Sequence, residues 1–309
     1  MKSKLFIFII VLFYVVRVDS FCLQPVGLEV SLFTGYVYGG SNEIVFTGKG
    51  SSNPLQKVSE LNWRVRNLWV LGANLQQRLF DNQFFVRVDG WSRVSSGYST
   101  MVDRDWENFD EPDVMTDIST STKTILPVAY LVDAAIGYYF YQTKGLEMSV
   151  EIGYEYSQYY WKSFGARYSY DQGDTIGTLP QNELLIAYQQ LLSVPYIGLN
   201  FDWTMNWLDL KIFGKYTHLA YVKDKDNHVL RKILFVDRFH AVEFWSVGLD
   251  AKIPLWKWID LDLKYVFEGL VPSVGNATMR EDGGMTYTQG GAGISHFHNL
   301  FTMGVTAHF

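Results

Sequence analysis

Two short stretches of the chain each place two ionisable side chains two residues apart. Asp103 and Asp105 form the first pair, and Asp226 and His228 form the second. In an extended strand, residues i and i+2 point to the same side, so each pair presents both groups on one face. Two such pairs that faced each other would make a carboxylate–imidazole cluster able to activate water.

Each pair has its own chemistry. Two carboxylates held close together cannot both ionise easily, so one pKa rises and the pair can hold a water molecule and take its proton. A carboxylate beside an imidazole fixes the orientation of the ring and raises its basicity, as in hydrolytic triads. Taken alone, Asp103 and Asp105 also fit a solvated acidic loop or a calcium site, and His228 also fits an exposed loop histidine.

The composition of the 309-residue chain favours a membrane β-barrel as the scaffold for these pairs. Aromatic residues make up 17% of the chain, which is high for a soluble domain, yet the mean hydropathy is only -0.01. In a membrane barrel, lipid-facing and lumen-facing residues alternate, so their hydropathies cancel. The net charge of -6 argues against a nucleic-acid partner.

The N-terminus predicts a secretory signal peptide, residues 1–20. Lys2 and Lys4 precede an apolar run from Leu5 to Val16 that is too short for a membrane span. Cleavage is expected within about three residues of position 20, which leaves 21–309 as one outer-membrane barrel domain. Cys22 is the only cysteine, so an internal disulfide and a multi-cysteine metal site are excluded.

Period-2 alternation predicts strands, most clearly near the C-terminus. Between residues 259 and 267, apolar side chains occupy the odd positions, and Asp260, Asp262 and Lys264 occupy even ones. A soluble antiparallel sandwich also alternates in this way. Charges in mid-strand, aromatic residues near strand ends and the terminal Phe309 favour the membrane barrel instead.

Turn signals divide the chain unequally. Short turns are expected at 81–82, 143–145, 202–207 and 254–258, and longer loops at about 40–55, 98–124, 163–181, 224–240 and 270–292. Short turns on one side and long loops on the other are typical of outer-membrane barrels. Five long-loop hairpins therefore predict an all-β, ten-stranded antiparallel transmembrane β-barrel with long extracellular loops, and both ionisable pairs lie at its outward rim.

Several stretches, in their order and spacing, resemble the omptin family of outer-membrane proteases. They are Lys57–Trp63 (KVSELNW), Met101–Trp106 (MVDRDW), Val194–Leu199 (VPYIGL), Asp224–His228 (DKDNH) and Gly290–Ile294 (GGAGI). The resemblance extends from about Val30 to Phe309. It implies a barrel in the cell outer membrane whose active site lies in a groove that faces the exterior.

The resemblance also implies catalytic roles. His228 would be the general base, and Asp226 would orient it. Asp103 and Asp105 would position a water nucleophile across the groove and stabilise the tetrahedral oxyanion. The family resemblance implies neither a metal nor another cofactor.

Substrate specificity carries over in the same way. Glu43 and Asp224 match two acidic residues of the family, and two carboxylates at the base of a pocket would bind a substrate Arg or Lys. The implied partners are extracellular proteins or peptides, cleaved beside a basic residue and, as we expect, between two of them. Taken alone, Glu43 also fits a lumen-facing strand charge.

One departure from the family concerns lipid. Family members bind lipopolysaccharide through charged residues on the outer barrel wall, and here Tyr154 matches one of those positions. However, Tyr156, Gln158 and Leu191 stand where a Glu and two Arg are expected, and His240 lies near the place of a Lys. Outer-membrane lipid remains an expected partner, with lipopolysaccharide as an activator that binds elsewhere or acts more weakly.

Two other functions stay open from the residues alone. A barrel lipase or acyl hydrolase needs a serine with a histidine and an asparagine. His296 and His298 lie at a predicted strand start, but no serine motif accompanies them. A non-enzymatic adhesin or small porin would use the acidic loops to bind ligands, although ten strands leave a lumen mostly filled by side chains.

Overall fold

The structure is a computed structural model that describes residues 27–309, apart from 96 and 282. The predicted signal peptide at 1–20, its cleavage site and Cys22 lie outside the described residues and stay predictions. Within the described part of the chain, no helix has the length and apolar character needed to cross a membrane.

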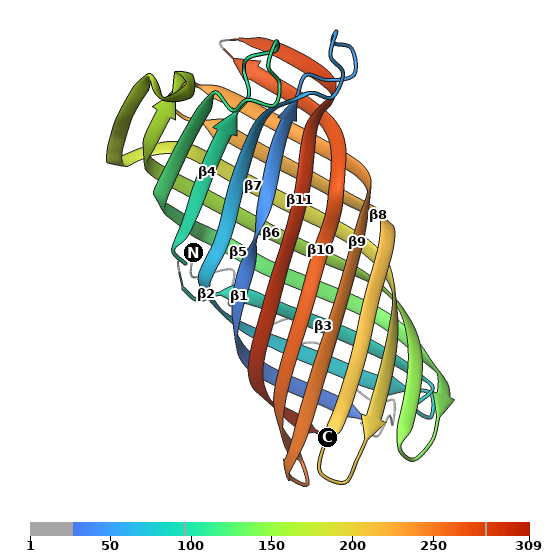
Figure 1. Cartoon of the computed structure of the whole chain (residues 1–309). Helices are drawn as coiled ribbons and strands as arrows, with labels where there is room; N and C mark the ends of the chain where they lie inside the picture. Colours follow the sequence, from blue (N-terminus) through green and yellow to red (C-terminus); the bar gives the residue numbers. More distant parts are fainter. Residues whose placement is uncertain (1–26, 96, 282) are drawn as a thin grey trace.

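The described residues form one antiparallel sheet that closes on itself (Figure 1). Its strands are β1 (Leu28–Phe46), β2 (Lys57–Leu79), β3 (Phe84–Arg93), β4 (Ser99–Asp105), β5 (Asp117–Gln142), β6 (Leu146–Tyr170), β7 (Thr175–Thr204), β8 (Asp209–His228), β9 (Ile233–Trp256), β10 (Ile259–Glu281) and β11 (Gly284–His308). The barrel closes because β1 pairs with both β2 and β11.

One position in the barrel wall holds two strands. Both β3 and β4 pair with β2 on one side and β5 on the other, so the eleven described strands fill ten wall positions. The break between them includes Gly97, whose φ of +55° is in the left-handed region that favours glycine. Asn67, on the facing strand β2, also has a positive φ of 53°. The prediction of a ten-stranded antiparallel transmembrane barrel is confirmed.

Side chains alternate between lumen and exterior in the sense expected of a membrane barrel. On β10, Asp260 and Asp262 are buried in the interior, whereas Leu263 is 40% exposed on the outer face. The outer face carries an apolar belt that includes Leu32, Leu71, Ile136, Ile152, Ile197 and Ile212. This inside-out arrangement excludes the soluble sandwich, whose interior would be apolar.

Exposed aromatic residues border the apolar belt. The upper girdle, nearer the long hairpins, includes Tyr38, Trp69, Tyr216 and Trp245, and the lower girdle includes Phe84, Trp203, Trp256 and Trp258. Such girdles mark the two membrane–water interfaces. We call the interior beyond the upper girdle the upper lumen, and the interior between the girdles the lower lumen.

The prediction of a long loop is wrong for three of the five regions. Regions 163–181, 224–240 and 270–292 are mostly strand, because β6 to β11 continue past the upper girdle and reverse in short turns (Figure 1). Their polar composition reflects water on the outer face beyond the membrane, whereas the backbone ladder continues. The longer connections that remain are 47–56 and 106–116.

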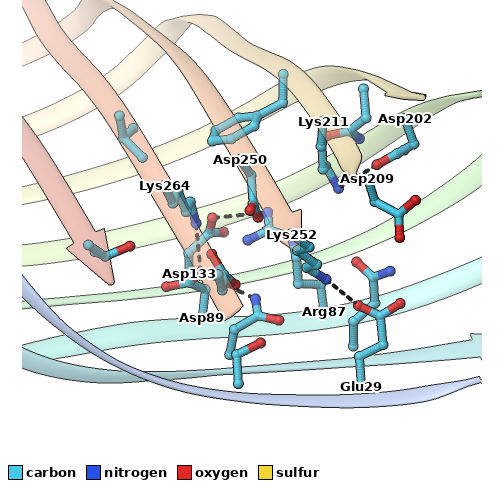
Figure 2. A pocket seen from close by; sticks show the side chains of 18 of the residues that line it. Glu29, Arg87, Asp89, Asp133, Asp202, Asp209, Lys211, Asp250, Lys252 and Lys264 are labelled. Carbon is cyan, nitrogen blue, oxygen red and sulfur yellow. Dashed lines mark hydrogen bonds and ion pairs between the residues drawn. The ribbon is translucent and has the colours of Figure 1, made fainter. Parts of the chain in front are cut away.

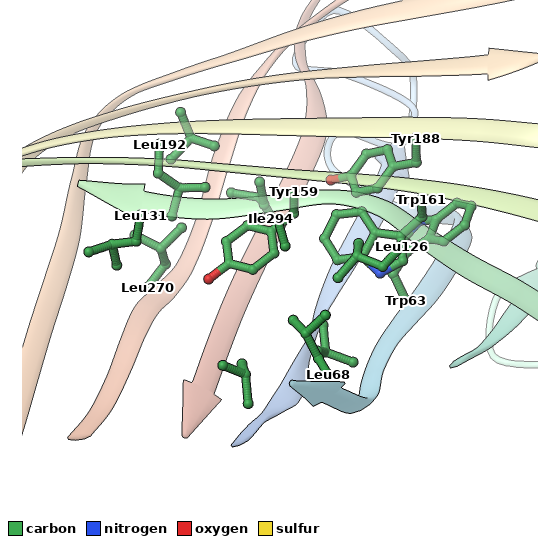
Figure 3. Close-up of a cluster of buried hydrophobic side chains, with 14 of the residues drawn as sticks. Trp63, Leu68, Leu126, Leu131, Tyr159, Trp161, Tyr188, Leu192, Leu270 and Ile294 are labelled. Carbon is green, nitrogen blue, oxygen red and sulfur yellow. The ribbon is translucent and has the colours of Figure 1, made fainter. Parts of the chain in front are cut away.

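Stacked aromatic rings fill the barrel between its two lumens. Trp63, Tyr159, Trp161 and Tyr188 are fully buried and form what we call the aromatic plug (Figure 3). The rings of Trp63 and Tyr188 stack with centroids 5.0 Å apart, and those of Trp161 and Tyr188 lie 5.5 Å apart. Tyr188 contacts a carboxylate of the upper lumen, and Tyr159 contacts His298 of the lower lumen. The plug therefore stands between the two regions.

Candidate active site

The structure brings Asp226 and His228 into direct contact at the end of β8. The Nε2 of His228 lies 2.6 Å from the Oδ2 of Asp226. Because β8 continues to His228, the two residues keep the i, i+2 relation of a strand, and both lie beyond Tyr216 of the upper girdle. Burial lowers the pKa of His228, but the Asp226 carboxylate outweighs it and raises that pKa overall.

Asp103 and Asp105 lie at the end of β4, where Ser59 of β2 donates a hydrogen bond to the Oδ1 of Asp103 at 3.3 Å. Burial raises the pKa of Asp103 to about 7, and the neighbouring Asp105 adds to the effect while His228 opposes it. Burial also raises the pKa of Asp105. This pair can therefore keep a proton near neutral pH.

The two pairs come from strands that are not neighbours, since β5, β6 and β7 separate β4 from β8 in the wall. Even so, Asp103 and His228 are close enough for each charge to alter the pKa of the other. The four residues are thus gathered at the mouth of the upper lumen, with carboxylates on one side and an imidazole–carboxylate pair on the other.

The calcium alternative has a geometric counterpart beside this site. One ligand atom from each of Asp105, Glu107 and Asp117 lies within 4.8 Å of the others. Asp103 does not belong to this group, and all three members are at least partly exposed. Exposed acidic groups of this kind are common without an ion, so the cluster adds nothing to the site.

Glu43 and Asp224 are both buried in the upper lumen, 2% and 1% exposed. The indole of Trp63 donates to the Oε2 of Glu43 at 3.4 Å, and the hydroxyl of Tyr188 donates to the Oδ2 of Asp224 at 3.1 Å. Within the described chain, neither carboxylate forms an ion pair with a lysine or arginine. The two predicted specificity residues therefore sit on the aromatic plug without a countercharge.

Burial raises the pKa of both carboxylates. The pKa of Glu43 lies well above its usual range because of burial, with Asp226 and Asp224 adding to the effect. Burial raises the pKa of Asp224 to about 7 against the hydrogen bond from Tyr188. A cation that entered this region would favour the charged form of each carboxylate.

Asp237 is a buried residue of this region that the sequence pattern did not indicate. It belongs to β9, is 3% exposed and lies directly opposite Asp224 of β8. The polar composition of region 224–240 predicts a loop, in which no residue has a fixed partner across a ladder. In the structure, His228 and Ile233 pair at the end of a tight hairpin, and this register places Asp237 across from Asp224. Predicting that hairpin from the sequence would have identified Asp237.

The lipase alternative gains no support from the two histidines on β11. His298 contacts the hydroxyl of Tyr159 at 3.3 Å and Glu268 at 3.1 Å. His296 is buried, and both its ring nitrogens lack a hydrogen-bond partner. In the chain from 27 onward, as described, no serine hydrogen-bonds to either ring.

The positions expected to bind lipid lie on the outer wall. Tyr130 donates to the Oε1 of Gln158 at 3.0 Å and packs 6.2 Å from the ring of Tyr156. His240 packs 4.9 Å from the ring of Tyr221. The described wall thus has aromatic and amide groups at the places where the family's charged residues are expected.

Comparison with known proteins agrees with the barrel fold. The Omptin family model matches residues 24–309. The plasminogen activator of Yersinia pestis is 24% identical over 93% of this chain and 91% of its own length. The outer membrane protease OmpP of Escherichia coli K12 is 25% identical over 94% of this chain and 92% of its own length.

A solved structure gives the same answer for the fold. The crystal structure of outer membrane protease OmpT from Escherichia coli superposes with a TM-score of 0.87 at 23% identity, and the match covers 94% of this chain and 99% of that one. The predicted outer-membrane location is confirmed by this fold and by the family match. The chain belongs to the Omptin family.

Proposed function

We propose that this chain is an outer-membrane endopeptidase that hydrolyses peptide bonds beside basic residues, with water as the nucleophile. The observation that carries the proposal is the 2.6 Å contact between His228 and Asp226. This contact lies at the same end of the barrel as Asp103 and Asp105. Family membership supports the reaction class, since OmpP and OmpT are named as outer membrane proteases.

The contact between His228 and Asp226 suggests how water is activated. With Nε2–H donated to Asp226, the Nδ1 of His228 carries the lone pair that accepts a proton from water. The water oxygen then attacks the peptide carbonyl, and the proton on His228 passes to the leaving amine. Asp226 stabilises the imidazolium formed in between.

The opposite pair supports the other half of the reaction. Because the pKa of Asp103 is raised to about 7, Asp103 and Asp105 can hold one proton between them at neutral pH. That proton can be donated to the developing oxyanion, while the charged partner holds the water in place, and it returns to the pair when the tetrahedral intermediate collapses. This division of labour needs both carboxylates and no metal ligand set.

The preference for basic residues is supported by the unpaired carboxylates of Glu43 and Asp224. A guanidinium or ammonium group would supply the countercharge that the described protein does not provide. Because the mouth of the upper lumen lies on the same side as the long hairpins, we place the site on the cell exterior. The substrates are then extracellular proteins or peptides with basic residues.

A quenched peptide with an Arg–Arg centre, and the same peptide with Gln–Gln, test this function. Purified wild type in detergent with added lipopolysaccharide should cleave only the Arg–Arg peptide. Asp103→Ala should lower kcat by about 10²–10⁴-fold. Asp224→Asn should mainly raise KM for the basic peptide, since its partner is the substrate side chain.

Two results would count against the proposal. Intact Arg–Arg peptide after long incubation with folded wild type would remove the protease function. Unchanged cleavage by Asp103→Ala would show that the wrong groups have been assigned to the chemistry.

A further inference from the structure

The upper lumen holds a third carboxylate that neither the chemistry nor the expected specificity pair uses. Asp237 lies directly across the β8–β9 ladder from Asp224, and both point into the interior. Like charges directly opposite each other destabilise a sheet. Burial, with Asp224 and Asp226 adding to it, keeps the pKa of Asp237 well above its usual range. A sheet keeps such a pair only if something offsets the cost.

Each member of this group has spare hydrogen-bonding capacity. The Oδ1 atoms of Asp224 and Asp237 are buried and have no partner, and Glu43 accepts a single bond, at 3.4 Å from Trp63. No lysine or arginine of the described residues forms an ion pair with any of the three. The unsatisfied oxygens therefore point to a cationic ligand that brings several donors.

The shape of the group argues against a metal ion as that ligand. Among the described residues, three ligand atoms within 4.8 Å of one another occur in the cluster of Asp105, Glu107 and Asp117, and not in this group. Glu43 also comes from β1, which β11 and β10 separate from β9 in the barrel wall. The three carboxylates are spread too widely for one compact ion to contact them all.

Spread carboxylates suit one basic side chain better than the other. A guanidinium has five N–H donors in a plane that point in different directions, whereas an ammonium has three donors on one atom. We propose that Asp237 is a third specificity-determining carboxylate, and that with Glu43 and Asp224 it selects a substrate arginine over a lysine. The inference rests on the proposed function, because it concerns the basic residue beside the cleaved bond.

Two peptides that differ only in the residue before the cleaved bond, Arg–Arg and Lys–Arg, test this selectivity. Wild type should cleave the Arg–Arg peptide with the higher kcat/KM. Asp237→Asn should lower kcat/KM for Arg–Arg by about tenfold to a hundredfold, the loss expected for one charged hydrogen bond, and for Lys–Arg by less than about threefold. Product masses confirm which bond is cut.

A matched control lies on the same strand. Asp250 also belongs to β9 but lines the lower lumen, so Asp250→Asn should leave the Arg-to-Lys ratio at its wild-type value. Folding of both variants is checked by far-UV circular dichroism and by urea unfolding in detergent. Asp237→Asn should unfold at no lower urea concentration than wild type, because it removes a like-charge contact.

Binding of small cations gives a readout that does not depend on cleavage. Agmatine and cadaverine have similar aliphatic chains. Agmatine ends in a guanidinium group, whereas cadaverine ends in an ammonium group. Agmatine should raise the thermal midpoint of wild type more than cadaverine does, and Asp237→Asn should abolish that difference.

The outcomes separate the two proposals. If wild type cleaves both peptides and Asp237→Asn keeps the wild-type ratio, the role of Asp237 is overturned and the protease function stands. If wild type cleaves neither peptide, the protease function fails. In that case an equal response of wild type and Asp237→Asn to agmatine overturns the inference too, and a selective loss in the variant supports it.

Discussion

Most buried carboxylates of the lower lumen have a cation within ion-pair distance, whereas those of the upper lumen have no lysine or arginine partner among the described residues. In the lower lumen, Lys215 lies 2.8 Å from both Asp133 and Glu155. Lys264 lies 3.1 Å from Asp89, as Figure 2 shows. Arg87 similarly bridges Asp133 and Glu151. In the upper lumen, Glu43, Asp224 and Asp237 have no such partners among the described residues. Paired charges hold the lower wall together, whereas the upper wall keeps carboxylates that, in our proposal, a basic substrate side chain would pair with.

The same contrast appears in two histidine–aspartate contacts of equal length. His228 lies 2.6 Å from Asp226 in the upper lumen, and His308 lies 2.6 Å from Asp260 at the opposite end of the barrel. Glu29, the carboxylate that interacts with His308, forms an ion pair with Lys252 at 2.6 Å. Among the described residues, no lysine or arginine pairs in this way with Asp103 beside His228. A short imidazole–carboxylate contact is therefore not enough to define a catalytic site, and the surrounding groups decide its role.

The largest effect should come from replacing His228, the histidine of the upper lumen. His228→Ala removes the proposed base, so kcat for the Arg–Arg peptide should fall by about 10²–10⁴-fold. His308→Ala is the matched control, because it breaks a contact of the same length in the other region, and it should keep wild-type kcat. Equal losses in both variants would mean that the histidines act through folding rather than catalysis.

The next effect tests the lower lumen. Lys215→Met leaves Asp133 and Glu155 without their shared cation, which should lower the free energy of unfolding by about 3–5 kcal/mol. Urea unfolding in detergent, followed by tryptophan fluorescence, measures the change. Lys211→Met is the control, since Lys211 lies 3.8 Å from Asp202 in a more exposed pair and should cost about 1 kcal/mol or less. A Lys215→Met barrel as stable as wild type would contradict a structural role for the lower pairs.

Stability should also depend on pH through the upper carboxylates. The pKa values of Asp103 and Asp224 are raised from 3.8 to about 7, so between these values the folded state holds protons that the unfolded chain has lost. The contribution is fully present below pH 3.8 and is lost as pH rises through about 7, by on the order of 4 kcal/mol for each carboxylate. Urea midpoints at pH 5 and pH 8 measure it.

The double variant Asp103→Asn/Asp224→Asn supplies the control for that titration. Its urea midpoint should change less between pH 5 and pH 8 than the wild-type midpoint does, because neither amide titrates. A wild-type midpoint that rises with pH would show that the upper carboxylates have countercharges after all.

The pattern within single strands predicts the barrel and much of the candidate site. The remaining contacts depend on the register between strands that are far apart in the sequence. Alternation along β10 is sufficient to place Asp260 and Asp262 inside the barrel, because a single strand reveals that period. The direct contact of Asp226 with His228 likewise follows from i, i+2 spacing on one strand. The position of Asp237 depends on the register of a second strand, and the cation pairs of the lower lumen depend on neighbours across the whole barrel. These contacts join residues that are far apart in the sequence, so no single segment of it predicts them.

The smallest effect concerns the outer wall, where uncharged side chains stand at the positions expected to bind lipid. Tyr156, Gln158 and Leu191 offer no cation to a lipid phosphate, so lipopolysaccharide should change kcat/KM of wild type by less than about fivefold, the range of one exposed charge pair. Gln158→Arg/Leu191→Arg should bind the lipid more tightly, by about 1 kcal/mol for each arginine. Titration of lipid-free protein with lipopolysaccharide measures both. Strong activation of wild type would instead direct attention to Lys223 and Arg238, which pair across β8 and β9 near the upper lumen.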